Sequence, residues 1–203
     1  MRPLVWLLLG PRIAPRVAFA QRSLLIANHL TAFDVPVILY ALSAADRDHV
    51  AVAMSGQVLT GWRQGKAERH RMVAPLTPFA YWLATALFNV FPLPRGAGLR
   101  QSFAHAGEAL DQGYHVLVFP EGRRSRDGLL QPFEPGIGLL AQESEVPVQP
   151  ILVEGLKLLH GKRWPKRGAV AVRLGEPLIM AAGEEPQAFT RRLQAAVAEL
   201  EHR

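Results

Sequence analysis

The sequence predicts an α/β protein, with a single layered domain and a mixed, largely parallel central sheet flanked by helices. Short apolar runs typical of buried strands alternate along the chain with segments whose apolar residues recur at helical spacing. This alternation is typical of strands joined by helical crossovers. The chain has 203 residues, of which 49% are hydrophobic and 20% charged, enough for a buried core. We therefore expect one domain over residues 1–203.

Five apolar runs are predicted as strands, because each is short and lies between turn-forming or polar residues. Pro150 falls inside one of them and lacks the N–H that an interior strand would donate. That run is therefore expected at an edge of the sheet or at a bulge. The five runs are 23–27, 50–54, 116–119, 148–153 and 169–174.

Four segments are predicted as helices. Residues 35–42 follow Asp34, a typical N-cap, and Pro36 is tolerated in a first turn. A second helix is expected to end at Gly113, since glycine commonly ends helices; residues 137–142 form a third. The second helix is indicated by Leu99, Phe103, Ala106 and Leu110, and the C-terminal one by Phe189, Leu193, Ala196 and Leu200.

The charge balance favours an anionic partner. Lys and Arg number 23 against 17 acidic residues, which gives a net charge of +6. A nucleic acid, a membrane surface or a phosphorylated substrate would suit such a chain. No helix-turn-helix or basic run interleaved with aromatics is evident, so nucleic acid is not expected. Cysteine is absent and the histidines lack a zinc-site spacing, so neither a disulfide nor a metal site is predicted.

Two apolar stretches favour contact with a membrane. Residues 4–9 are apolar but end at a Gly-Pro-Arg sequence, so we interpret 1–20 as an apolar and basic membrane-contacting segment rather than a signal peptide. Residues 74–93 carry no charge, yet prolines at both ends leave only 79–91 for a helix. That length suits a re-entrant or a core helix rather than a span. A basic run precedes it, and 63–93 together are predicted to form a membrane-facing insertion.

A histidine and an aspartate follow the first predicted strand. His29 comes just after residues 23–27, and Asp34 opens the next helix. Ligand sites of α/β folds lie beyond the carboxyl ends of strands. A carboxylate that folds back onto an imidazole fixes its tautomer and makes the other ring nitrogen more basic. His29 is therefore a candidate general base; alternatively, His29 is only a polar residue at a strand end and Asp34 only a helix cap.

A second polar segment follows the strand at 116–119. Glu121 and Gly122 come directly after a Phe-Pro pair. Glycine allows a ligand to approach the backbone, and arginine forks match phosphate oxygens. A solvated basic turn would also explain the charges. The arginines here are Arg123, Arg124 and Arg126.

A glycine pattern near the middle of the chain resembles a dinucleotide fingerprint. Gly136, Gly138 and Ala141 satisfy G-x-G-x-x-A. The pattern follows a Glu-Pro pair rather than the end of a strand, so no dinucleotide site is expected.

Taken together, these segments resemble the glycerolipid acyltransferase family, typified by 1-acylglycerol-3-phosphate acyltransferases. Asn28, His29 and Asp34 match its N-H-x4-D motif. Residues 119–125 match its F-P-E-G-T-R-S motif, and 146–150 resemble its fourth block. The motifs occur in the family's order, and the implied fold is acyltransferase-like.

The likeness spans roughly residues 20–160 and has two departures. Arg123 stands where the family usually has threonine. The family's second block is F-x-x-R, whereas three residues separate Phe91 from Arg95 here. Arg95 is thus a weaker match than Arg124.

The resemblance implies transfer of a fatty acyl group from acyl-CoA or acyl-carrier protein to the free hydroxyl of 1-acylglycerol-3-phosphate in phospholipid biosynthesis. His29 would remove the hydroxyl proton and Asp34 would orient His29. The hydroxyl would attack the thioester directly, without an acyl-enzyme. The chemistry implies no cofactor beyond the acyl thioester co-substrate, and no metal.

The acceptor would be held by the arginine turn. By resemblance, Arg124 and Arg95 would bind the acceptor phosphate, Glu121 would position the glycerol hydroxyls, and Gly122 would let the backbone approach. Another lysophospholipid or an amino-lipid is an alternative acceptor, and a non-catalytic lipid-binding membrane protein is an alternative function.

The expected partners are a lysophospholipid, an acyl thioester and an anionic membrane surface, with no nucleic acid. The expected location is peripheral or monotopic, on the cytoplasmic face of the membrane. The sequence predicts no particular oligomeric state.

Overall fold

A computed structural model of the chain describes residues 2–13, 19, 21–55, 60, 61, 63, 64, 82, 85, 89–93, 99–161 and 163–202. Within these residues, seven strands form one sheet in the order β1-β7-β6-β2-β5-β3-β4. The strands are β1 (Arg12–Ile13), β2 (Leu24–Ala27), β3 (Val50–Ser55), β4 (Asn89–Leu93), β5 (His115–Val118), β6 (Val148–Glu154) and β7 (Ala171–Leu174). The helices are α1 (Arg2–Leu8), α2 (Asp34–Ala41), α3 (Ala44–Arg47), α6 (Leu99–Asp111), α7 (Gly136–Ser144) and α8 (Pro186–Glu199), with 3-10 helices η2 (Leu156–Gly161) and η3 (Leu200–His202).

The sheet is mixed and largely parallel, as the alternation of strands and helices predicts. Neighbours from β4 through β3, β5 and β2 to β6 all pair in parallel. β7 runs antiparallel to β6, and β1 pairs with β7 in parallel. The carboxyl ends of β2 and β5 therefore lie at one edge of the sheet, side by side, where ligand sites of parallel sheets form.

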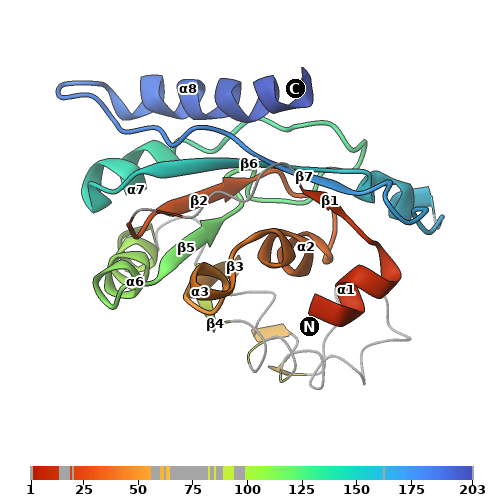
Figure 1. Cartoon of the computed structure of the whole chain (residues 1–203). Coiled ribbons are helices and arrows are strands. Elements are labelled where there is room, and N and C mark those ends of the chain that lie inside the picture. Colours follow the sequence, from red (N-terminus) through yellow and green to blue (C-terminus); the bar gives the residue numbers. More distant parts are fainter. Residues whose placement is uncertain are drawn as a thin grey trace.

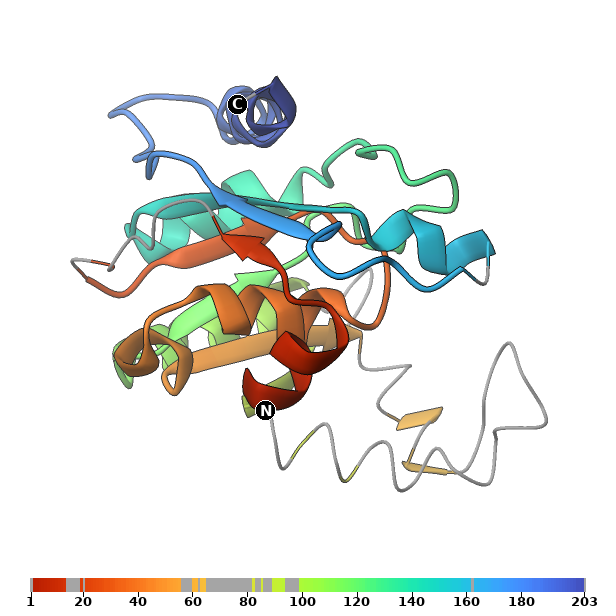
Figure 2. The ribbon, with the colours of Figure 1, turned by 45° about the vertical axis from the view of Figure 1, so that its right-hand side comes forward.

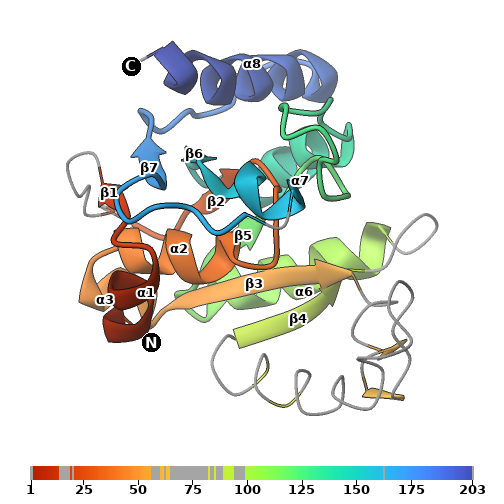
Figure 3. The same ribbon diagram turned by 90° about the vertical axis from the view of Figure 1, so that its right-hand side faces the viewer.

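Helices cover both faces of the sheet, so its central strands are buried. Alternate residues of β2 show this: Leu24 and Ile26 pack in the core beneath α6, α7 and α8, whereas Leu25 and Ala27 pack against α1 and α2. Figure 2 shows α8 above the sheet with α1 and α2 below it. The two ends of the chain thus lie on opposite faces, as Figures 1 and 3 also show.

The strand that contains Pro150 is interior, so the predicted edge position is wrong. β6 lies between β2 and β7. The Pro150 carbonyl accepts the N–H of Gly175, but proline has no N–H to return to the Gly175 carbonyl. The side-chain amide of Gln149 donates to that carbonyl instead. A buried side chain next to the proline therefore replaces the missing bond.

The glycine pattern at 136–141 serves helix packing. A Cβ on Gly138 would lie 2.0 Å from the carbonyl oxygen of Pro186, at the start of α8. Only glycine lets α7 and α8 approach this closely. α8 buries Phe189, Leu193 and Val197, so Val197 takes the core position that the sequence assigned to Ala196.

Two other predictions need correction. Phe33, not Asp34, is the N-cap of α2; the Asp34 carboxylate turns back to the preceding loop. The helix predicted over 79–91 is wrong at its end, because Asn89–Leu93 forms the edge strand β4 beside β3. An apolar run of this length suits either element by periodicity alone. The rest of 63–93 lies largely outside the described residues.

Candidate active site

The loop that carries His29 is anchored by the residue before it. Asn28 follows β2 and is buried. Its Nδ2 donates to the Val153 carbonyl at 2.9 Å, and its Oδ1 accepts the Val153 N–H at 2.8 Å. The side chain thus pairs with β6 as a strand backbone would, and it holds the turn at the end of the parallel sheet. The sequence motif contains Asn28, but its spacing assigned this residue no role.

His29 and Asp34 are in contact. Nδ1 of His29 lies 2.8 Å from Oδ2 of Asp34, across the turn between β2 and α2. The imidazole is half-buried and the carboxylate is fully buried. With the Nδ1 proton directed at Asp34, Nε2 is the ring nitrogen that can accept a proton from a substrate. The predicted contact between His29 and Asp34 is present in the structure.

The Asp34 carboxylate is fixed by its own loop. Oδ2 also accepts the backbone N–H groups of Leu30 and Thr31, at 2.6 and 2.9 Å, and Oδ1 accepts the Thr31 hydroxyl at 3.1 Å. These bonds replace the hydrogen bonds to water that the carboxylate lost on burial. Asp34 is therefore held in one orientation toward His29.

The second motif lies directly against the first. The N–H of His29 donates to Oε1 of Glu121 at 2.8 Å, and the carbonyl of His29 accepts the N–H of Ser125 at 2.8 Å. The ring of Phe119 stacks on the imidazole with centroids 4.2 Å apart. Segments far apart in the sequence therefore form one site, as their places after β2 and β5 predict.

Glu121 is a buried acid whose pKa is raised. Only 2% of its surface is exposed. Burial raises the pKa of the Glu121 carboxyl to about 7, although the N–H groups of His29 and Gln131 act in the opposite direction. Oε2 accepts the Gln131 N–H at 3.2 Å. Both oxygens thus already hold backbone groups of the site.

The arginine turn projects into solvent beside this cluster. Gly122 has a φ of +65°, a left-handed conformation that favours glycine. The Ser125 hydroxyl donates to Asp127 at 2.8 Å and accepts the Gly128 N–H, so the turn is ordered. Arg124 is exposed on this turn, as are Arg123 and Arg126. Arg95 lies outside the described residues.

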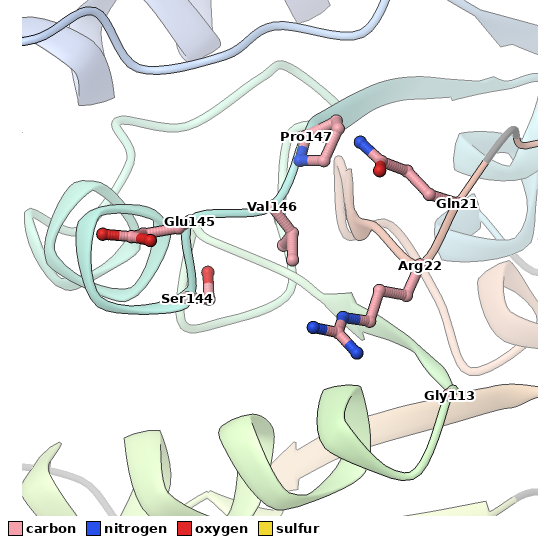
Figure 4. A pocket seen from close by; sticks show the side chains of 7 residues that line it. All are labelled: Gln21, Arg22, Gly113, Ser144, Glu145, Val146 and Pro147. Atoms are coloured by element: carbon pink, nitrogen blue, oxygen red, sulfur yellow. The ribbon is translucent and has the colours of Figure 1, made fainter.

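A cavity of about 540 Å³ lies at the other end of the parallel strands (Figure 4). Its walls come from the segments that precede β2, β5 and β6, whereas His29 and Glu121 follow β2 and β5. The cavity therefore does not belong to the candidate site. Its lining residues are Gln21, Arg22, Gly113, Ser144, Glu145, Val146 and Pro147.

The described part of the chain holds no group of three or more His, Asp or Glu side chains placed to bind a metal ion. Among its helices, none has both the length and the apolar character needed to cross a bilayer.

The fold and site define an α/β protein in which a histidine contacts a buried aspartate. This pair lies beside an arginine turn, at the carboxyl ends of the parallel strands. The sequence matches the acyltransferase family over residues 11–154. The chain belongs to that family, which confirms the resemblance found in its motifs.

Curated relatives of this chain are named 1-acyl-sn-glycerol-3-phosphate acyltransferases. The chain is 34% identical over 130 residues to a 1-acyl-sn-glycerol-3-phosphate acyltransferase of Pseudomonas aeruginosa, covering 60% of this chain and 48% of that protein. It is 30% identical over 115 residues to 1-acyl-sn-glycerol-3-phosphate acyltransferase alpha of Mus musculus, covering 55% of this chain and 40% of that protein. The chain thus spans half or less of the length of these relatives.

A solved structure shares the fold. The crystal structure of the 1-acyl-sn-glycerophosphate acyltransferase PlsC from Thermotoga maritima aligns with a TM-score of 0.63 at 22% identity. The alignment covers all of this chain and 77% of that one. The predicted mixed sheet flanked by helices is therefore confirmed as an acyltransferase-like fold.

Proposed function

We propose that this protein transfers a fatty acyl group from acyl-CoA or acyl-carrier protein to the free hydroxyl of 1-acylglycerol-3-phosphate. The observation that carries the proposal is the 2.8 Å contact between Nδ1 of His29 and Oδ2 of Asp34. Membership of the acyltransferase family and the names of the curated relatives support the same reaction. The phosphorylated acceptor also suits the exposed arginine turn.

His29 acts as the general base. Its Nε2 takes the proton of the acceptor hydroxyl while the hydroxyl oxygen attacks the thioester carbonyl carbon. The carbon–sulfur bond then breaks, an ester forms, and the thiolate leaves with the proton that His29 carried. Buried Asp34 stabilises the transient imidazolium. General base catalysis of this kind contributes about 10²–10⁴-fold to the rate.

The acceptor is bound by the turn after β5. Arg124, together with Arg95, binds the phosphate as a bidentate partner. The Gly122 backbone lies against the substrate. Glu121 positions the glycerol hydroxyls through lone pairs that its two backbone contacts leave available, since a carboxylate offers about four acceptor sites. No cofactor takes part beyond the acyl thioester.

The reaction takes place at an anionic membrane surface, on its cytoplasmic face. Both the lysolipid acceptor and the acyl product belong to a bilayer, and the net charge of +6 favours anionic lipid. Residues 1–20 and 63–93 are the segments proposed from the sequence to contact it, within a single domain over 1–203.

A panel assay tests this function. Purified protein is offered radiolabelled acyl-CoA or acyl-carrier protein with 1-acylglycerol-3-phosphate and with lysolipids of other headgroups. We expect acylation of the phosphate monoester acceptor, and its loss in His29→Ala. Transfer only to another lysolipid would replace the proposed acceptor, and no transfer with any pair would remove the enzymatic proposal.

A further inference from the structure

An apolar surface lies beside the candidate site. It is formed by one side of α1, by Phe33 and by the loop that follows η2. We call it the Trp164 surface and define it by six large apolar side chains that are between 40% and 61% exposed. They are Leu4, Trp6, Leu7, Leu8, Phe33 and Trp164. Apolar side chains gathered in this way commonly mark an interaction site.

The Trp164 surface is held together by contacts between distant segments. Nε1 of Trp164 donates to the Leu8 carbonyl at 3.2 Å, and its ring meets the Phe33 ring edge-on at 5.7 Å. The N–H of Gly168 donates to the Leu9 carbonyl at 3.0 Å. On the opposite side of α1, Val5 is buried in the core below the sheet. The exposed side chains are thus fixed to the body of the protein.

Cations surround this surface. Arg163, Lys166 and Arg167 are exposed, and the guanidinium of Arg167 lies 4.3 Å from the centre of the Trp6 ring. Residues 2–13 and 156–170 contain no Asp or Glu. This composition, with tryptophan and leucine beside lysine and arginine, is typical of a protein surface that lies in the headgroup region of an anionic bilayer.

The Trp164 surface ends at the turn that carries the base. Phe33 directly precedes Asp34, and its N–H donates to the Thr31 hydroxyl at 3.0 Å. That hydroxyl in turn donates to the carboxylate of Asp34. A bilayer that touches Phe33 would therefore lie next to the loop between β2 and α2, where the proposed acceptor must arrive.

We propose that the Trp164 surface docks this protein onto an anionic lipid bilayer. The inference rests on the proposed function for its purpose, which is to bring lipid to His29, but the docking itself needs no turnover. α1 and the loop around Trp164 lie outside residues 11–154, so the match to the acyltransferase family covers only Phe33 of this surface. It adds a C-terminal loop to the membrane contact predicted from residues 1–20.

Vesicle sedimentation tests the docking, using the full chain without substrates. The lipids are phosphatidylcholine alone and phosphatidylcholine mixed with phosphatidylglycerol. We expect binding to the anionic vesicles and little binding to the neutral ones. Lys166→Glu should weaken binding of the protein to the anionic vesicles at least about fivefold, since each cation near an anionic surface favours binding by this factor. Leu7→Ser should weaken it about tenfold through lost apolar contact.

Matched controls lie near α8, on the other side of the sheet. Arg191→Glu makes the same charge change as Lys166→Glu, and Ile179→Ser removes an equally exposed apolar side chain, 66% against 61% for Leu7. Both controls should bind anionic vesicles within about twofold of the unaltered chain. Thermal denaturation checks that each variant is folded, and the two surface variants test the proposal independently.

Several results would overturn the docking proposal. These are equal binding to both vesicle types, no binding at all, or surface variants that bind as well as their controls. Self-association that Leu7→Ser abolishes, without vesicle binding, would identify a protein interface instead.

A water-soluble short-chain lysophosphatidate separates this inference from the proposed function. Lys166→Glu should still acylate it, whereas His29→Ala should still bind vesicles but transfer nothing. Vesicle binding without any transfer by the unaltered chain would leave the docking intact and remove the function.

Discussion

The backbone N–H of His29 donates a 2.8 Å hydrogen bond to Oε1 of Glu121, a residue 92 positions further along the chain. This bond joins the end of β2 to the end of β5, and the ring of Phe119 stacks on the imidazole in the same place. His29 and the arginine turn are therefore positioned by one another. A change in either segment is expected to affect both.

Replacing the proposed base should remove acyl transfer and leave the fold intact. His29→Ala is expected to lower kcat about 10²–10⁴-fold, because no other group would take the hydroxyl proton. Initial rates with acyl-CoA and 1-acylglycerol-3-phosphate measure the effect. His105→Ala, on α6 away from the turn, serves as the control and should keep full activity. Near-normal turnover in His29→Ala would contradict the mechanism.

Replacing the proposed orienting acid, Asp34, should affect both activity and stability. Asp34→Asn keeps the shape but offers a neutral group to four donors, including the imidazole. We expect kcat to fall by about 10²–10⁴-fold and the free energy of unfolding to fall by about 1–2 kcal/mol. Steady-state kinetics and urea denaturation measure these effects. Asp48→Asn changes an exposed acid, and a matching loss there would refute a specific role for Asp34.

Removing the proposed phosphate ligand should act on one substrate. Arg124→Ala is expected to raise the KM for 1-acylglycerol-3-phosphate about 10- to 100-fold, the range for a lost charged hydrogen bond. The KM for acyl-CoA should change much less. Kinetics with each substrate varied in turn measure the two constants, and Arg191→Ala on α8 is the control. Equal increases for both substrates would place the phosphate elsewhere.

The raised pKa of Glu121 predicts a component of stability that depends on pH. Folding raises the pKa of this carboxyl from 4.5 to about 7, so the folded state favours the protonated form. Its stabilising contribution is fully present below 4.5 and is lost as the pH rises through about 7. Glu121→Gln removes the titration. Urea denaturation at pH 5 and pH 8 should show a larger fall in unfolding free energy for the unaltered chain than for this variant, and parallel changes would contradict the shift.

The close approach of α7 and α8 predicts a cost for any side chain at Gly138. A Cβ there would overlap the Pro186 carbonyl, so Gly138→Ala should lower the free energy of unfolding by about 1–3 kcal/mol. Gly107→Ala in α6 is the matched control, because its Cβ would meet nothing within 4 Å. That control should be neutral or stabilising. Equal melting temperatures for both variants would disprove the packing argument.

Much of the fold follows from local pattern, and the exceptions are long-range. β2 and β5 are short apolar runs buried on both faces, so composition predicts them. The sequence predicts an edge or a bulge for β6, because the Gln149 bond that offsets Pro150 reaches a residue 26 positions away. The sequence predicts the end of a helix where β4 lies, because an uninterrupted apolar run has no period that separates a helix from a strand.

The candidate site divides in the same way. The approach of His29 to Asp34 is a local turn, and its geometry could be expected from five-residue spacing after a strand. The pairing of Asn28 with β6 joins residues 125 positions apart, and no spacing rule reveals it. The contact of Trp164 with Leu8 joins residues 156 positions apart and is equally hidden. Only the tertiary structure shows which distant segments complete the site.

The position of α8 bears on what would be a minimal folding unit. This helix buries Phe189 and Leu193 against the sheet, yet it lies beyond the residues that match the acyltransferase family. A fragment trimmed to 11–154 would expose the apolar face of the sheet that α8 covers. It would also leave β6 without its antiparallel neighbour β7. Such a fragment should aggregate rather than fold, even though it retains every proposed reacting group.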